Sequence, residues 1–214
     1  MANSRFGMAL LAAATVLAGC GSPIEPDRFY RLHEPPPSSI EVPVPLGPVE
    51  VQPFPARGLL QSERAILFRQ GRDGRRIERH AHDFFEEAPA DMVRGALLRC
   101  LRDRGPFALV LDGERGVTAQ FSLDGRLLQF EQVVGEADAF VTVDLIATLV
   151  DLTRGRPILN RRLHVEIPAA DTSIESAIRS FEAANEEICR RLLEDPALRA
   201  AAGGETQSDM PASR

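Results

Sequence analysis

Two histidines and several carboxylates lie close together in the middle of the chain. The segment reads His80-Ala81-His82-Asp83, and Glu86 and Glu87 follow it. Histidines two residues apart on a strand point to the same face, where their nitrogens could bind a transition metal. A hydrolytic site needs more ligands, and the other histidines are His33 and His164. We therefore favour a polar strand leading into an acidic helix start, with a metal-dependent periplasmic hydrolase as the less favoured alternative.

The sequence contains no further pattern typical of catalysis. No phosphate-binding loop, G-x-G-x-x-G or G-x-S-x-G sequence follows a predicted strand, and Asp112-Gly113 and Asp124-Gly125 are turn signals. We therefore expect a protein without catalytic residues, metal or cofactor.

The N-terminus has the pattern of a bacterial lipoprotein signal. Arg5 precedes an apolar run, residues 8–17, of about ten residues, which is too short to span a bilayer. Leu17-Ala18-Gly19-Cys20 follows directly. Cleavage before Cys20 would leave a cysteine carrying acyl chains, such as palmitate, on its sulfur and amine. The alternative is an ordinary secretory signal that ends near a cysteine.

The composition limits the partners of the mature chain. All basic residues are arginine, and removal of Arg5 with the signal takes the formal net charge from −6 to −7. This balance repels nucleic acid and anionic headgroups. No second apolar stretch is long enough for a transmembrane helix. The roughly 150 residues that can fold suffice for one domain.

The chain divides into four parts. Residues 1–19 are the signal peptide, and residues 20–48 form a lipid-anchored, proline-rich tether that includes Phe29-Tyr30-Arg31-Leu32. Residues 49–195 form the globular domain. Residues 196–214 lack apolar periodicity, and we expect this tail to be disordered.

Hydrophobic periodicity predicts an α+β domain, with an antiparallel sheet of about four to six strands and two amphipathic helices packed on one face. One helix begins at Pro89 and ends before Gly105-Pro106, and the other follows the capping box Thr172-Ser173-Ile174-Glu175. Asp124-Gly125 is either a hairpin turn or, as we favour, a bulge in one long strand. The predicted strands are residues 49–54, 65–69, 76–85, 107–111, 119–134 and 140–151, and after a turn over residues 153–156 a last strand ends at Ile167.

Two cysteines remain in addition to Cys20. Cys100 and Cys189 each fall in the apolar stripe of a predicted helix, in a chain exported to an oxidising compartment. A disulfide would join the two helices, but two separate buried thiols are the favoured arrangement.

The sheet face away from the helices is a candidate partner surface, because the strand over residues 140–151 is partly apolar on both sides. Ordinary surface hydrophobes are the alternative explanation. The candidate residues are Phe140, Thr142, Ile146 and Val150.

The order of sequence blocks resembles the ABC-type transport auxiliary lipoproteins, a family that includes the lipoprotein of the paraquat-inducible operon. Cys20 is followed by Phe29-Tyr30-Arg31-Leu32, a proline-rich spacer and residues 49–54, and then by Gly58-Leu59-Leu60 and residues 64–69. Residues 82–89, which open the first helix, complete the resemblance. Family members often carry Trp just before this helix, whereas this chain has Phe85, which cannot donate an indole hydrogen bond.

The resemblance implies a non-enzymatic protein anchored at the periplasmic face of the outer membrane. Its partners would be a lipid-binding protein of the mammalian-cell-entry type, a permease and an ATPase, which together move lipids between the envelope membranes. Gly21 after Cys20 agrees with sorting to the outer membrane. A lipoprotein of the lipopolysaccharide-export assembly and a purely structural envelope lipoprotein are the alternatives. The lipid carried, the direct contact with lipid and the formation of a homo-oligomer stay open.

Overall fold

The computed structural model describes residues 25–33, 45–113, 117–136 and 138–204. The predicted signal peptide and Cys20 lie outside these ranges. The described residues form, in order, β1 (Arg28–Tyr30), β2 (Val49–Val51), α2 (Leu59–Ser62), β3 (Ala65–Gln70), β4 (Ile77–Phe85), α3 (Pro89–Arg104), β5 (Val110–Leu111), β6 (Phe121–Val134), β7 (Ala139–Asp151), β8 (Arg156–Ala169), α4 (Ile174–Leu193) and α5 (Pro196–Gly204).

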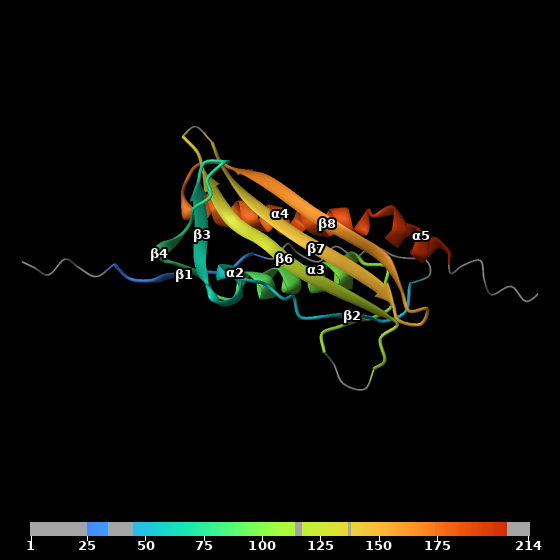
Figure 1. Ribbon diagram of the computed structural model, residues 1–214. Helices are drawn as coiled ribbons and strands as arrows, with labels where there is room; N and C mark the ends of the chain where they lie inside the picture. Colours follow the sequence, from blue (N-terminus) through green and yellow to red (C-terminus); the bar gives the residue numbers. More distant parts are fainter. Residues whose placement is uncertain (1–24, 34–44, 114–116, 137, 205–214) are drawn as a thin grey trace, which may run out of the picture.

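Three long antiparallel strands, β6, β7 and β8, form the main part of one sheet (Figure 1). The other edge of β6 is shared between two groups of strands. β2 lies parallel to its first residues, with Val49 opposite Phe121, and β5 extends the sheet beyond β2. β3 lies parallel to its last residues, with Phe68 opposite Gln132, and β4 and then β1 follow.

The domain is α+β as predicted, but the sheet is larger than the predicted four to six strands. It has eight strands in the described residues, and it is mixed instead of antiparallel, because β1, β2 and β5 run parallel to their neighbours and β3 runs parallel to β6. β1, β2 and β5 are only two or three residues long. β2 and β5 fall within the predicted strands 49–54 and 107–111, whereas β1 lies in the predicted tether, and its three residues carry too little alternation to be recognised from sequence.

The two long helices lie on the same face of the sheet, as Figure 1 shows. Pro89 occupies the first turn of α3, where its missing N–H is not needed, and Gly105 follows the last residue. At the start of α4 the Ser173 side chain accepts a hydrogen bond from the Ser176 N–H at 3.2 Å. Both predicted helices are therefore confirmed. None of the helices in the described ranges combines the length and apolarity needed to cross a bilayer.

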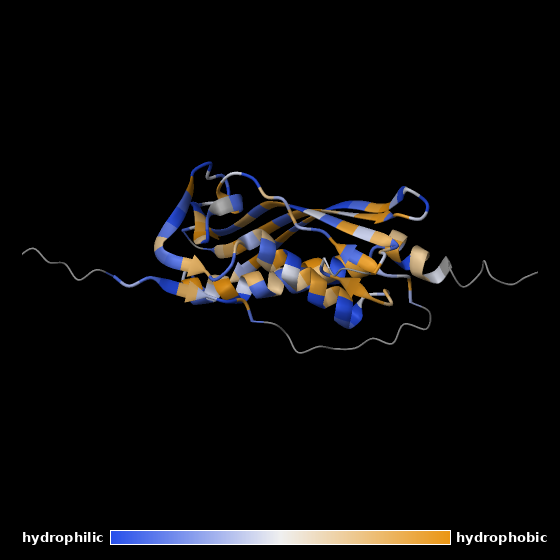
Figure 2. Ribbon diagram, turned by 90° about the horizontal axis from the view of Figure 1, so that it is seen from below, coloured by the Kyte–Doolittle hydropathy of each residue, from blue (hydrophilic) through white to orange (hydrophobic). Residues whose placement is uncertain are grey.

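The hydrophobic core lies between the sheet and these helices. Hydrophobic and hydrophilic residues alternate along the long strands (Figure 2), and the apolar face of β7 is fully buried. Phe181 of α4 stacks on Phe130 of β6 with ring centroids 4.2 Å apart, and Phe85 contacts both rings edge-on. Burial of such rings is the main stabilising contribution in a domain of this size.

Several features of the fold differ from the sequence prediction. β6 is one long strand, as favoured, but its irregularity lies between Leu127 and Gln129 instead of at Asp124-Gly125. The predicted tether contributes β1 to the sheet, and Leu46 is buried in a bridge to Phe107. The tail predicted to be disordered begins with the helix α5, because Leu198 packs into the core with 2% of its surface exposed.

Candidate functional site

The candidate site is the sheet face that points away from the helices, which is where the sequence predicted a partner surface. Strand alternation directs Phe140, Thr142, Ile146 and Val150 to this face. The structure brings them onto one strand but does not leave them all accessible. Phe140 and Thr142 are 3% and 1% exposed, whereas Ile146 and Val150 are half-buried.

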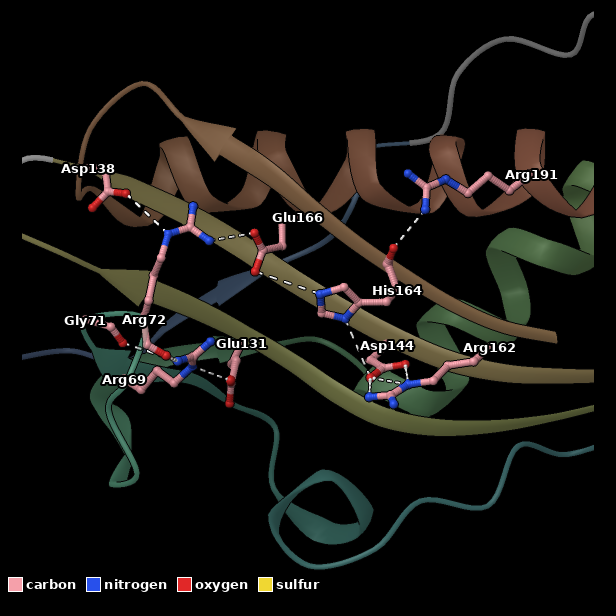
Figure 3. Close-up of polar contacts among 10 residues, drawn as sticks. All are labelled: Arg69, Gly71, Arg72, Glu131, Asp138, Asp144, Arg162, His164, Glu166 and Arg191. Carbon is pink, nitrogen blue, oxygen red and sulfur yellow. Dashed lines mark hydrogen bonds and ion pairs between the residues drawn. The ribbon is translucent and has the colours of Figure 1, made fainter.

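Arg72 covers the most apolar part of this face. It lies between β3 and β4, and its guanidinium carbon is 4.0 Å from the centroid of the Phe140 ring. Arg72 Nη1 donates to Glu166 Oε2 of β8 at 2.7 Å, and Asp138 lies 3.8 Å from its Nε (Figure 3). The bond from Arg72 to Glu166 raises the pKa of the guanidinium. The predicted apolar patch is therefore replaced by a charged one at this position.

A second ion pair lies beside it and is nearly buried. Arg69 Nε of β3 donates to Glu131 Oε1 of β6 at 2.7 Å, and Arg69 also donates to the carbonyl of Gly71 at 3.2 Å (Figure 3). Arg69 thus connects β6 with the turn that holds Arg72. Removing one partner of such a pair leaves an uncompensated buried charge.

A third group lies further along the same face. Asp144 of β7 is buried and accepts hydrogen bonds from Arg162 Nε at 3.0 Å, which raises the pKa of Arg162. His164 lies between two carboxylates, with Nδ1 3.6 Å from Asp144 and Nε2 3.8 Å from Glu166. The carbonyl of His164 accepts from Arg191 of α4 at 2.8 Å (Figure 3).

The arrangement is a charge-compensated polar surface. Each of the three carboxylates Glu131, Asp144 and Glu166 has an arginine partner. The strand register places Thr142 between Glu131 and Glu166, and its buried Oγ1 has no hydrogen-bond partner in the described part of the chain. Hydrogen bonds and ion pairs on protein surfaces contribute to specificity and orientation more than to affinity.

The two histidines considered as metal ligands, His80 and His82, contact different residues. His80 Nε2 lies 3.4 Å from Gln132 Oε1, and the His80 ring contacts Phe68. His82 Nδ1 lies 3.1 Å from Asp27 Oδ1. Across residues 25–33, 45–113, 117–136 and 138–204, no three His, Cys, Asp or Glu side chains form a group that could hold a metal ion.

Asp83 forms hydrogen bonds with β1 that were not predicted from the sequence. It accepts from Arg28 Nε at 2.7 Å and from the Tyr30 hydroxyl at 3.1 Å, and both donors belong to β1. The hydrogen bonds from Arg28, followed by that from Tyr30, lower the pKa of Asp83. The apolar character of residues 29–32, which is unusual for a tether, was the feature of the sequence that could have indicated that this segment packs against the domain.

A groove of about 660 Å³ lies between α3 and α4. Cys100 and Cys189 are joined by a disulfide with an S–S distance of 1.98 Å, and both line this groove. Of the two arrangements considered for these cysteines, the structure has the disulfide instead of the separate thiols that were favoured. The rest of the lining mixes both charges with small residues, including Gly95, Arg99 and Glu182.

No family model matches the sequence, and no curated protein is significantly similar to it. Two solved structures show the same fold. Protein XCC0632 from Xanthomonas campestris, described under the family model DUF330, aligns with a TM-score of 0.68 and 17% identity over 84% of this chain and 98% of its own. An uncharacterised protein aligns with a TM-score of 0.59 and 13% identity over 78% of this chain and 99% of its own.

Proposed function

We propose that this chain is a lipid-anchored, non-catalytic auxiliary component of an ABC-type intermembrane lipid transport system, located at the periplasmic face of the outer membrane. The observation that carries the proposal is the position of Cys20 at the end of an apolar leader, only eight residues before β1. The sequence blocks that resemble the auxiliary lipoproteins support it, and so does the fold shared with XCC0632.

The structure explains how an anchor at Cys20 would hold the whole domain. β1 is paired with β4 and bound to Asp83, so a restraint at the N-terminus passes directly to the sheet. Arg31 adds a bidentate ion pair with Glu86, which lowers the pKa of that carboxyl. A domain anchored in this way stays beside the membrane instead of diffusing through the periplasm. Stable anchoring requires more than one acyl chain.

The charged sheet face is the surface that we assign to the partner, a lipid-binding protein of the mammalian-cell-entry type that works with a permease and an ATPase. Arg72, Arg162 and His164 are accessible polar groups there, with roughly half to two thirds of each side chain exposed. Each lies over a buried carboxylate or ring and is therefore held in a defined position. Positioned charges of this kind favour one partner orientation.

The test of the anchor is the replacement Cys20→Ala followed by fractionation of the cells. We expect the wild-type protein in the outer-membrane fraction and Cys20→Ala in the soluble periplasmic fraction, with mass spectrometry showing acyl chains on Cys20 of the wild type only. Sedimentation of Cys20→Ala with the outer membrane would contradict the anchor.

The test of the transport role is purification of the intact lipoprotein from detergent extracts. We expect a protein with lipid-shuttling domains to accompany the wild type and to be reduced with Arg162→Glu. Arg156→Glu, an equal charge reversal at an exposed residue at the start of β8, serves as the control on another part of the molecule. An absence of any such protein favours a structural envelope lipoprotein.

A further inference from the structure

Phe29 is an exposed aromatic residue on β1, the edge strand that pairs with β4. With 59% of its surface exposed, it is the most exposed large hydrophobic side chain in the described ranges. Its ring stacks on Phe84 of β4 with a centroid distance of 5.7 Å. The Arg64 guanidinium carbon lies 5.9 Å from the Phe29 centroid, within the range of a cation–π contact. Phe29, Phe84 and Arg64 are called the aromatic patch below.

β1, which carries Phe29, is bound to the domain through the side chains on its opposite face. Side chains alternate along a strand, so Arg28 and Tyr30 point away from Phe29, and both bind Asp83. The Tyr30 carbonyl also accepts from the Glu86 N–H at 2.9 Å. Phe29 is therefore an exposed ring on a fixed backbone, and its exposure is not a consequence of an unpaired segment.

The chain between Cys20 and the domain limits how far the aromatic patch can lie from the acyl chains. Glu25, the first described residue, is five residues after Cys20. Five residues span at most about 17 Å even when fully extended, and nine residues to Phe29 span at most about 30 Å. Figure 1 shows β1 at the end of the sheet opposite the turn after β7. With Cys20 acylated, a connection this short would hold the β1 end at the bilayer.

We propose that the aromatic patch is a membrane-contact surface, with the Phe29 ring in the headgroup layer of the leaflet that holds the Cys20 acyl chains and Arg64 beside the lipid phosphates. This inference rests on the proposed acylation of Cys20. An aromatic ring and an arginine are well suited to the boundary between headgroups and acyl chains, where one is buried and the other stays hydrated. The net negative charge of the mature chain excludes a general attraction to anionic lipid, so the contact depends on the anchor.

The chain contains no tryptophan, which makes the proposal directly measurable. Phe29→Trp introduces a single tryptophan, which can be excited apart from Tyr30, into the intact lipoprotein. The protein is reconstituted into vesicles of phosphatidylcholine and phosphatidylglycerol with brominated acyl chains. We expect a blue-shifted emission and quenching of about twofold or more, because interfacial side chains lie about 5–10 Å into the headgroup and acyl-chain boundary. Leu152→Trp is the matched control, since Leu152 is also half-exposed but lies in the turn after β7. It should not be quenched.

A second variant covers the case in which Phe29→Trp disturbs β1. Phe84→Trp places the fluorophore on the neighbouring ring and should show the same direction of quenching with smaller amplitude. Equal emission and quenching in Phe29→Trp, Phe84→Trp and Leu152→Trp, with acylated Cys20 confirmed by mass spectrometry, would overturn the membrane contact and leave the anchor intact. An unmodified Cys20 in a protein that does not float with the vesicles would overturn both.

Discussion

Asp83 shows how one side chain can decide where a segment of the chain lies. Its carboxylate is almost buried on β4 and accepts hydrogen bonds from two residues of β1, a strand of three residues with no other sheet neighbour in the described ranges. Hydrogen bonds to an ionised acceptor are about twice as strong as neutral ones. The attachment of β1 therefore depends on this carboxylate as well as on backbone pairing.

Asp83→Asn should loosen β1 without unfolding the domain. We expect amide exchange in residues 28–30 to become faster by roughly tenfold, because the neutral amide binds the Arg28 guanidinium less strongly. Trypsin cleavage after Arg28 and Arg31 should accelerate in the same variant. Tyr30→Phe, which removes one of the hydrogen bonds and keeps the ion pair, is the control and should have a smaller effect.

The pH dependence of this contact follows from the lowered pKa of Asp83. A carboxyl whose pKa is lower in the folded state stabilises the fold above its unfolded pKa, near 3.8, and loses that contribution as pH falls through the folded pKa. Wild type and Asp83→Asn should therefore differ by a constant amount at neutral pH and converge only below about pH 4. A difference that disappears between pH 8 and 6 would contradict the role of Asp83.

At the scale of elements, one edge of β6 is shared by two separate strands, β2 and β3. β2 pairs with residues 121–123 and β3 with residues 132–134, so the middle of the strand has no partner strand on that side in the described ranges. Phe54 packs there against Gly125, and a Cβ on Gly125 would lie 2.4 Å from the Phe54 ring. The glycine thus lets an aromatic ring pack closely against the strand between the two groups.

Gly125→Ala should destabilise the domain by about 1–3 kcal/mol, the usual cost of overpacking a core position. Phe54→Leu in the same chain should recover part of this loss, because leucine leaves space where the ring was. Thermal unfolding of both variants provides the measurement. Gly95→Ala on α3, whose Cβ would meet only the mobile end of Arg99 at 3.3 Å, is the control and should not destabilise. Equal melting temperatures for Gly125→Ala and wild type would contradict the packing argument.

Elements that depend on local sequence could be predicted, whereas contacts between distant segments could not. α4 and the strands β7 and β8 carry a capping residue and long periodic patterns, so local sequence determines them. The alternation along β7 also correctly directs Phe140 and Thr142 away from the helices. That Arg72 covers Phe140 depends on how a distant turn folds over the sheet. Local periodicity contains no information of this kind, and the same is true of β1 and of α5.

At the scale of the whole molecule, the two helices cover different parts of the sheet. α3 packs against β5 and β6, whereas α4 packs against β7 and β8. The disulfide between Cys100 and Cys189 joins these helices across a sequence separation of 89 residues. It therefore closes a loop that contains most of the sheet.

Replacing this disulfide should destabilise the protein strongly but leave its fold unchanged. The comparison uses Cys20→Ala as the reference, so that Cys100 and Cys189 are the only cysteines. Closing a loop of this length restricts the unfolded chain, and losses of about 2–5 kcal/mol are typical when such a bond is removed. Cys20→Ala/Cys100→Ala/Cys189→Ala should therefore unfold at a urea concentration lower by about 1–2.5 M.

The reference protein should match the triple variant once dithiothreitol is added, because reduction removes the same constraint. The denatured reference should also show no reactive thiol before reduction. Two reactive thiols, or identical urea midpoints without reductant, would mean that packing alone holds α3 to α4.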